Sequence, residues 1–223
     1  MSASIIIGET PRGEPIEIDI KELLATRLLV QGNSGSGKSH LLRRLLEESA
    51  GIVQQVVIDP EGDFVSLAEE FGHVVIDGAA YGEAEIVRLG ARIRQHRASV
   101  VLALDELEID QQMKCASLGA MTNLMCRGRK RGLAGVIATQ RLAKLAKNVA
   151  AEASNFLMGR TFLDIDMVRA ADLLGMERRQ AEQIRDLARG QFLGLGPAIA
   201  RRPVAVNIGE VRTGAKSVTP GLV

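Results

Sequence analysis

The chain has 223 residues, of which 46% are apolar and 25% charged, and its formal net charge is +1. This length suits one sizeable domain, and the near-neutral charge excludes a generally basic coat for nucleic acid. No apolar run approaches the roughly 20 residues of a membrane span, and no signal segment follows Met1. Cys115 and Cys126 have no Cys or His partners at metal-ligand spacing, which indicates reduced cysteines in a cytoplasmic protein.

The first 26 residues predict a small β-hairpin. An apolar run at residues 5–7 is followed by a Pro-Arg-Gly turn, and residues 15–20 then alternate between apolar and acidic side chains. This segment is too short to be a domain of its own.

Residues 32–39 fit the phosphate-binding pattern G-x-x-x-x-G-K-[ST] at every fixed position. The flanking residues predict a buried strand at 27–31 and an amphipathic helix at 39–50 that ends at Gly51. A chance glycine-rich turn would not explain this context. Glycines let backbone N–H groups face a phosphate, and the helix N-terminus adds partial positive charge. The expected nucleotide-binding residues are Gly32, Asn33, Ser34, Gly35, Ser36, Gly37, Lys38, Ser39 and His40.

Strands at 55–59 and 73–77 alternate with helices at 64–71 and 83–95, which predicts an α/β fold with a mostly parallel sheet covered by helices on both faces. Ligands of such sheets bind at the carboxyl ends of the strands. Asp59, Asp77, Asp105 and Gln140 all follow or end predicted strands. The pattern therefore places the candidate site residues at one edge of the sheet.

An acidic pair, Asp105 and Glu106, follows the apolar strand at residues 100–104. In the functional interpretation Asp105 holds Mg²⁺, as does the Ser39 hydroxyl, and Glu106 polarises the water that attacks the γ-phosphorus. The alternative is a strand that runs into an acidic turn. A pair of this kind favours a nucleoside triphosphatase over a small-molecule kinase, since a kinase does not need an activated water.

Residues 111–151 contain Lys and Arg but no Asp or Glu. Inside this basic segment, residues 134–140 predict a strand that ends in Gln140, a candidate sensor of the γ-phosphate. The basic side chains are expected to contact DNA or a neighbouring subunit's nucleotide, and the alternative is a solvated helix end at 127–131.

The remaining third of the chain predicts further strands and helices. Strands are expected at 155–162, 191–195 and 204–208, with Arg160 inside the first of them. Helices are expected at 149–153, from an Asp164 cap to residue 174, and at 177–188. His40, His73 and His96 have no nucleophile or metal cluster around them and are interpreted as structural.

The chain resembles the HerA/FtsK superfamily of DNA-translocating ATPases, most closely the HerA branch. Five ordered blocks carry the resemblance: the loop at 32–39, Ile-Asp-Pro-Glu-Gly-Asp-Phe at 58–64, Leu-Asp-Glu at 104–106, Gly-Arg-Lys-Arg-Gly at 128–132 leading to Ala-Thr-Gln-Arg at 138–141, and Gly-Arg at 159–160. Together they span about residues 28–208.

The resemblance implies a RecA-like P-loop ATPase fold, with the acidic pair on a strand separated from the loop strand by an added one. It implies ATP and Mg²⁺ as ligands, a hexameric ring, and DNA as partner. Glu106 is then the base, Lys38 and Gln140 contact the γ-phosphate, and Arg160, or less favourably Arg129 or Arg141, reaches a neighbouring subunit's nucleotide. Residues 1–26 form a lead-in, 27–213 the ATPase domain and 214–223 a loose tail.

Two departures from the family pattern limit these expectations. Leu142 stands where the family has Pro, and the β-barrel that docks a partner nuclease has no counterpart here. The sequence therefore predicts a minimal motor core whose nuclease partnership stays open. The alternative hypothesis is a nucleotide-dependent assembly module with little turnover.

Overall fold

The computed structural model describes residues 3–59, 62–77, 99–103, 133–145 and 147–214. These residues form a ten-stranded sheet in the order β2-β1-β10-β9-β8-β3-β7-β6-β4-β5. The strands are β1 (Ser4–Glu9), β2 (Pro15–Asp19), β3 (Leu28–Gln31), β4 (Gln54–Asp59), β5 (Val74–Asp77), β6 (Ser99–Ala103), β7 (Leu133–Thr139), β8 (Asn155–Gly159), β9 (Gln191–Gly196) and β10 (Ala200–Ile208). Strands β8, β3, β7, β6, β4 and β5 are mutually parallel, whereas β9, β10, β1 and β2 pair antiparallel.

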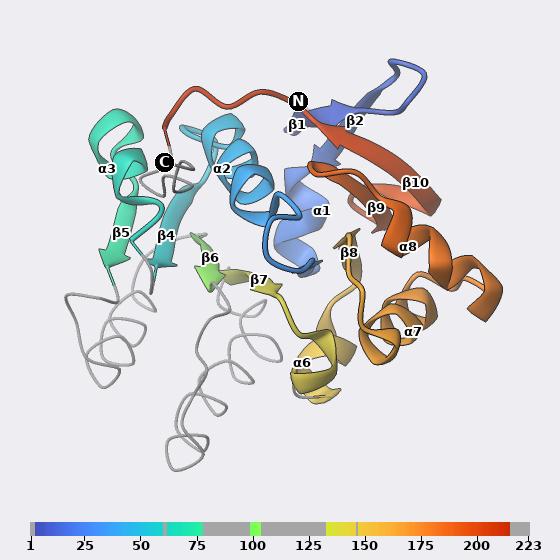
Figure 1. Cartoon of the computed structure of the whole chain (residues 1–223). Helices are drawn as coiled ribbons and strands as arrows, with labels where there is room; N and C mark the ends of the chain where they lie inside the picture. Colours follow the sequence, from blue (N-terminus) through green and yellow to red (C-terminus); the bar gives the residue numbers. More distant parts are fainter. Residues whose placement is uncertain (1–2, 60–61, 78–98, 104–132, 146, 215–223) are drawn as a thin grey trace, which may run out of the picture.

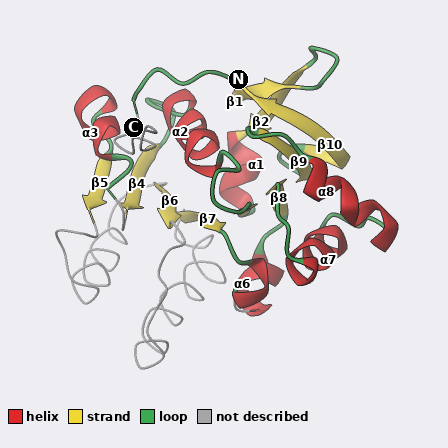
Figure 2. Cartoon of the chain, viewed as in Figure 1, coloured by secondary structure: helices red, strands yellow, loops and turns green. Residues whose placement is uncertain are grey.

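Helices cover both faces of this sheet (Figures 1 and 2). The helices are α1 (Ile20–Ala25), α2 (Lys38–Glu48), α3 (Val65–Phe71), α6 (Lys147–Glu152), α7 (Asp164–Leu173) and α8 (Glu182–Asp186), with short 3₁₀ turns η2 (Leu142–Lys144) and η3 (Arg178–Ala181). Buried side chains of α1, α2 and α3 join one apolar core, and those of α6, α7 and α8 join a second core on the other face. The predicted mostly parallel, two-faced α/β architecture is confirmed.

The expected hairpin is present as β1 and β2, but it does not stand apart, because β1 pairs with β10 and so extends the central sheet. The sequence analysis missed α1, although Asp19 marks its start: the Asp19 carboxylate accepts the N–H groups of Lys21 and Glu22. Among the described residues, no helix has the length and apolar character needed to cross a membrane.

Three details of the C-terminal half differ from the sequence prediction. The strand that was expected to include Arg160 ends at Gly159, so Arg160 lies in the loop after β8. Asp164 does not cap α7; the N-cap is Leu163, and Asp164 pairs with Arg185 instead. The helix expected at 177–188 is divided into η3 and α8.

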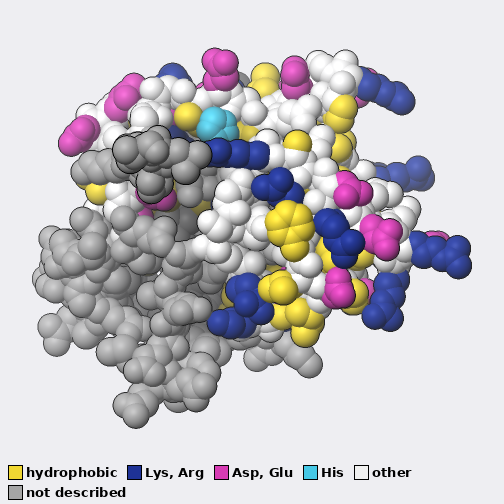
Figure 3. Space-filling view, viewed as in Figure 1, with side chains coloured by type: hydrophobic (Ala, Val, Ile, Leu, Met, Phe, Trp, Pro, Cys, Tyr) yellow, Lys and Arg dark blue, Asp and Glu magenta, His cyan; other side chains and the backbone are white. Residues whose placement is uncertain are grey.

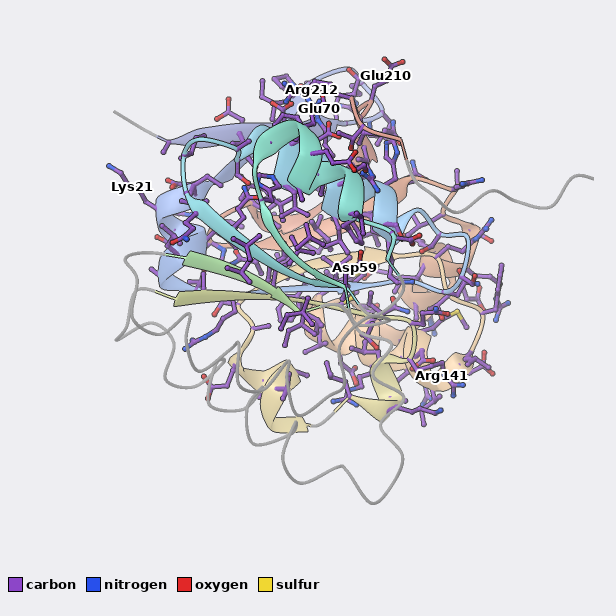
Figure 4. The ribbon with its side chains drawn as sticks, turned by 90° about the vertical axis from the view of Figure 1, so that its left-hand side faces the viewer. Lys21, Asp59, Glu70, Arg141, Glu210 and Arg212 are labelled. Carbon is purple, nitrogen blue, oxygen red and sulfur yellow. The ribbon has the colours of Figure 1, made fainter. Side chains whose placement is uncertain are left out.

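The helix that follows the glycine-rich loop is anchored by two buried charged residues. Glu47 of α2 accepts hydrogen bonds from the backbone N–H groups of Arg212 and Thr213 and from the Thr213 hydroxyl. Arg43, one turn earlier, donates to Ser66 and Thr213 and lies over the Phe64 ring. The C-terminal strap, residues 209–214, is thereby tied across α2, and Arg212 lies on the α3 side of the sheet (Figure 4).

Burial raises the pKa of the Glu47 carboxyl, but the hydrogen bonds from the strap outweigh burial and leave that pKa below its ordinary value. A carboxyl with a lowered folded-state pKa stabilises the protein at pH values above its unfolded pKa, and this contribution disappears as the pH falls through the folded pKa. Glu47 is therefore expected to contribute stability at neutral pH.

Replacing Glu47 by alanine removes the acceptor for three donors of the strap. We expect the free energy of unfolding at neutral pH to fall by about 2–4 kcal/mol, since buried donors lose their partner. Urea unfolding followed by circular dichroism measures the change.

The matched control is Glu48→Ala, which removes the neighbouring carboxylate that pairs with Arg44 and Arg212 near the surface. Its expected cost is below about 1 kcal/mol. In acid, below the ordinary carboxyl range, wild type and Glu47→Ala should converge in stability. A gap that stays constant with pH would contradict the role assigned to the Glu47 charge.

Candidate nucleotide-binding site

The glycine-rich loop connects β3 to α2 at the carboxyl end of the parallel strands (Figure 1). Its backbone is bonded to neighbouring elements on both sides. The N–H of Gly32 donates to the carbonyl of Thr139, the last residue of β7, at 3.2 Å, and the N–H of Asn33 donates to the carbonyl of Arg160 after β8 at 2.9 Å. On the far side, the N–H of Gly190 donates to the carbonyl of Ser36 at 2.9 Å. The loop is thus fixed by main-chain contacts.

Two glycines of the loop occupy positions that a side chain would disrupt. Gly37 has a φ of +100°, and a Cβ there would lie 2.9 Å from the nitrogen of Gly190. A Cβ at Gly32 would lie 2.4 Å from the Ser36 hydroxyl oxygen. The pattern requires glycine here because the loop packs closely against itself and against the turn before β9.

Helix α2 starts immediately after this loop, at Lys38, and no side chain caps its N-terminus. Uncapped N–H groups and the helix dipole together favour an anion. Five polar atoms near the loop are buried without a hydrogen-bond partner among the described residues: Gln31 Oε1 and Nε2, Asn33 Oδ1, Ser36 Oγ and Arg160 Nε. The Ser39 side chain is exposed. The backbone N–H groups at the start of α2 and the hydroxyls of Ser36 and Ser39 are hydrogen-bond donors that fit a nucleotide phosphate chain.

The candidate sensor Gln140 follows β7 directly, beside the loop strand β3. Its neighbour Arg141 pairs through Nε with the buried carboxylate of Asp166 at 3.3 Å. Figure 4 shows Arg141 on the face of the sheet opposite Arg212. Arg160 lies on the other flank of the loop, with its guanidinium 5.4 Å from the Phe162 ring centroid. The structure therefore brings Gln140 and Arg160 to opposite sides of the glycine-rich loop.

Strand β6 ends at Ala103, two residues before Asp105 in the sequence. It pairs with β7, which in turn pairs with β3, so one strand separates it from the loop strand. This confirms the strand order that the family resemblance implies. Asp105, Glu106 and Arg129 lie outside the described residues, and so does His96.

Asp59 stands at the strand end where the sequence places it, but its carboxylate is used within its own loop. It is buried, and its two oxygens accept the N–H groups of Gly62 at 3.0 Å and Phe64 at 2.7 Å. Burial raises the pKa of Asp59, partly opposed by these backbone donors. Asp59 thus holds the backbone at Gly62 and Phe64, and the Phe64 ring lies beneath Arg43 of α2.

Both described histidines bond through Nε2 to main-chain carbonyls, His40 to that of Gly209 and His73 to that of Leu46, and the expected contact of His40 with a nucleotide stays a prediction. Burial lowers the pKa of His73. Sequence reasoning missed Gly190 and Asp166. In the sequence, Gly190 indicates only the end of a helix. Asp166 indicates only a favourable negative charge in the first turn of a predicted helix.

The strand–loop–helix unit, the parallel block and the strand order define a P-loop fold of the RecA-like class. Residues 5–123 match the family described as "Helicase HerA, central domain", and the chain belongs to this family. A comparison with curated protein sequences gave no match.

Solved structures with a similar fold share less than 20% sequence identity with this chain. The cytoplasmic domain of the Thermomonospora curvata type VII secretion ATPase EccC has a TM-score of 0.70 and 19% identity, over 93% of this chain and 28% of that one. B204, the DNA-packaging ATPase from Sulfolobus Turreted Icosahedral Virus, has a TM-score of 0.63 and 18% identity, over 83% and 98%. The pCW3 conjugation coupling protein TcpA with ATPγS has 0.66 and 18%, over 95% and 67%. The chain thus spans little more than a quarter of the EccC chain.

Replacing Gly37 by alanine is expected to weaken ATP binding by more than about tenfold. The left-handed backbone alone costs an alanine about 1–2 kcal/mol, and its Cβ also meets Gly190. Titration of a fluorescent ATP analogue measures the affinity.

Gly51→Ala is the control, since Gly51 has a similar φ of +76° after the end of α2 and open space where a Cβ would point. It should lower stability by about 1 kcal/mol while leaving ATP affinity unchanged. Equal affinity in both variants would refute the close-packing argument for the loop.

Proposed function

We propose that this protein is the ATP-hydrolysing core of a DNA motor that works as a ring oligomer, with hexamers as the expected form. The observation that carries the proposal is the start of α2, which no side chain caps, directly after a phosphate loop held by main-chain hydrogen bonds, with Gln140 beside that loop at the end of β7. Membership in the HerA central-domain family supports ATP as the substrate. B204 and TcpA, which share the fold, act in DNA packaging and conjugation by their names, and this supports DNA as the partner.

The residues of the site suit hydrolysis of the γ-phosphate by water. The loop N–H groups and Lys38 hold the phosphate chain, and Gln140 contacts the γ-phosphate from β7. Glu106 takes a proton from the attacking water as it approaches the γ-phosphorus. Arg160 of a neighbouring subunit stabilises the charge of the transition state.

The residues also fit Mg²⁺, a hard cation that prefers oxygen ligands and keeps several waters. The exposed hydroxyl of Ser39 at the start of α2 and the carboxylate of Asp105 after β6 would hold it. When bound, this ion neutralises charge on the phosphate oxygens.

The basic segment of residues 111–151 would contact DNA phosphates without regard to sequence. Described Lys and Arg residues are interspersed with acidic ones on the surface shown in Figure 3, so the described part has no uniformly basic face in that view. We assign coupling to DNA to the basic segment on its excess of Lys and Arg over Asp and Glu.

Lys38→Ala should abolish ATP hydrolysis by removing the phosphate contact, and Glu106→Gln should retain ATP but turn it over at least about 10²-fold more slowly. A phosphate-release assay with and without duplex DNA, paired with nucleotide binding, measures both. DNA should raise the wild-type rate. Hydrolysis by Lys38→Ala at the wild-type rate would refute the proposal. A wild-type protein that stays monomeric and hydrolyses ATP at the same rate with and without DNA would favour the alternative, an assembly module.

Mixing tests whether Arg160 acts across subunits. Arg160→Ala keeps its own phosphate loop but supplies no arginine, and Lys38→Ala supplies the arginine but cannot use ATP. Such an arginine contributes about 10³- to 10⁵-fold in turnover, so the mixture should exceed the summed rates of its components. Native mass spectrometry confirms mixed rings. A rate equal to the sum in proven mixed rings would assign Arg160 elsewhere.

A further inference from the structure

The segment after β7 is fixed to α7 by two charged side chains. Asp166 is fully buried in the first turn of α7; its Oδ1 accepts the N–H of Ala143 at 2.6 Å, and its Oδ2 pairs with Arg141 Nε at 3.3 Å. Arg169, one turn further along α7, donates to the carbonyl of Leu142 at 2.7 Å. Helix α7 therefore holds both N–H and C=O groups of η2.

Gln140 lies between this attachment and the phosphate loop. On one side, the carbonyl of Thr139 accepts the N–H of Gly32, the first residue of the loop. On the other side, the hydroxyl of Thr139 accepts the N–H of Arg141, whose side chain is held by Asp166. The position of Gln140 is consequently set by the loop strand and by α7 together.

Stability alone does not explain why Asp166 and Arg141 form an ion pair. The Asp166 side chain is 0% exposed, whereas the Arg141 side chain is 46% exposed and would be solvated without a partner, and a buried ion pair of this kind is weak evidence for stability. The pair does, however, restrict the direction of a segment whose first residue, Gln140, borders the loop. A positioning role accounts for a charge that stability does not require.

We propose that Asp166 is a positioning residue for ATP hydrolysis, which acts through Arg141 and the N–H of Ala143 to hold Gln140 beside the phosphate loop. This inference rests on the proposed function, because it needs Gln140 to contact the γ-phosphate. Asp166 itself touches no nucleotide. Its loss should slow turnover and leave nucleotide binding by the loop intact.

The test is steady-state ATP hydrolysis by Asp166→Asn, Arg141→Gln and the double variant. The asparagine oxygen still accepts the N–H of Ala143, but it no longer carries the charge that pairs with Arg141. Since a misplacement of ~1 Å can cost ~10²-fold in rate, we expect kcat to fall about tenfold or more while KM for ATP changes less than about twofold. Arg141→Gln removes the pair from its exposed side without threatening the fold and should show the same fall.

The double variant should be no slower than either single variant, because both remove one interaction. The matched control is Asp164→Asn, an identical charge change two residues earlier on α7, at a side chain that is 87% exposed and pairs with Arg185. It should keep the wild-type kcat. A lower melting temperature for Asp166→Asn with unchanged kcat, or additive effects of the two single changes, would overturn the inference.

The outcomes also separate this inference from the proposed function. If the wild type hydrolyses ATP no faster than Lys38→Ala, the proposed function fails and the inference fails with it. If the wild type hydrolyses ATP but Asp166→Asn and Arg141→Gln keep its kcat, only the inference fails.

Discussion

The structure depends on the main-chain hydrogen bonds that clamp the glycine-rich loop between three neighbours. Thr139, Arg160 and Gly190 each bond to a backbone group of the loop, from the ends of β7 and β8 and from the turn before β9. Within the loop the N–H of Ser36 donates to the carbonyl of Asn33, and the bonds to the three neighbours add the restraint that a short loop of this kind needs if it is to hold its remaining N–H groups toward an anion. Because the restraint comes from backbone atoms, it demands a particular geometry of the neighbouring strands and leaves their side chains available for other roles.

Side chains of α2 also hold the helix that follows the glycine-rich loop in place. Buried Arg43 and Glu47 join α2 to Asp63 in the turn after β4, to Ser66 of α3 and to the C-terminal strap, so the helix that begins at Lys38 is anchored about one and a half and two and a half turns beyond its start. Asp59 shapes that turn through two backbone donors. The site is thereby built on rigid elements with supporting contacts, which is the arrangement that precise positioning of a reacting phosphate requires.

The sequence predicts the phosphate loop, the parallel block and the strand ends well, because each rests on local patterns: fixed glycine spacing, runs of apolar residues and breaks between them. It does not predict that β1 joins β10 or that Glu47 receives the strap, since those contacts link residues far apart in the chain. From the sequence, Asp59 is a candidate ligand residue at a strand end. In the structure its carboxylate accepts backbone N–H groups of its own loop. A sequence gives the position of a carboxylate but not the donors that surround it. For the same reason, the sequence does not predict that Asp166 contacts Arg141 and Ala143.

The free edge at β2 constrains how copies of this protein can associate. The strand is short, begins with Pro15, which has no N–H to donate, and carries Glu17 and Asp19. A second copy approaching this edge would meet like charges and a missing donor, so a continuous cross-subunit sheet is disfavoured there. Contacts made at β2 in an assembly would therefore depend on side chains, and they could form or separate without breaking a shared ladder of strands.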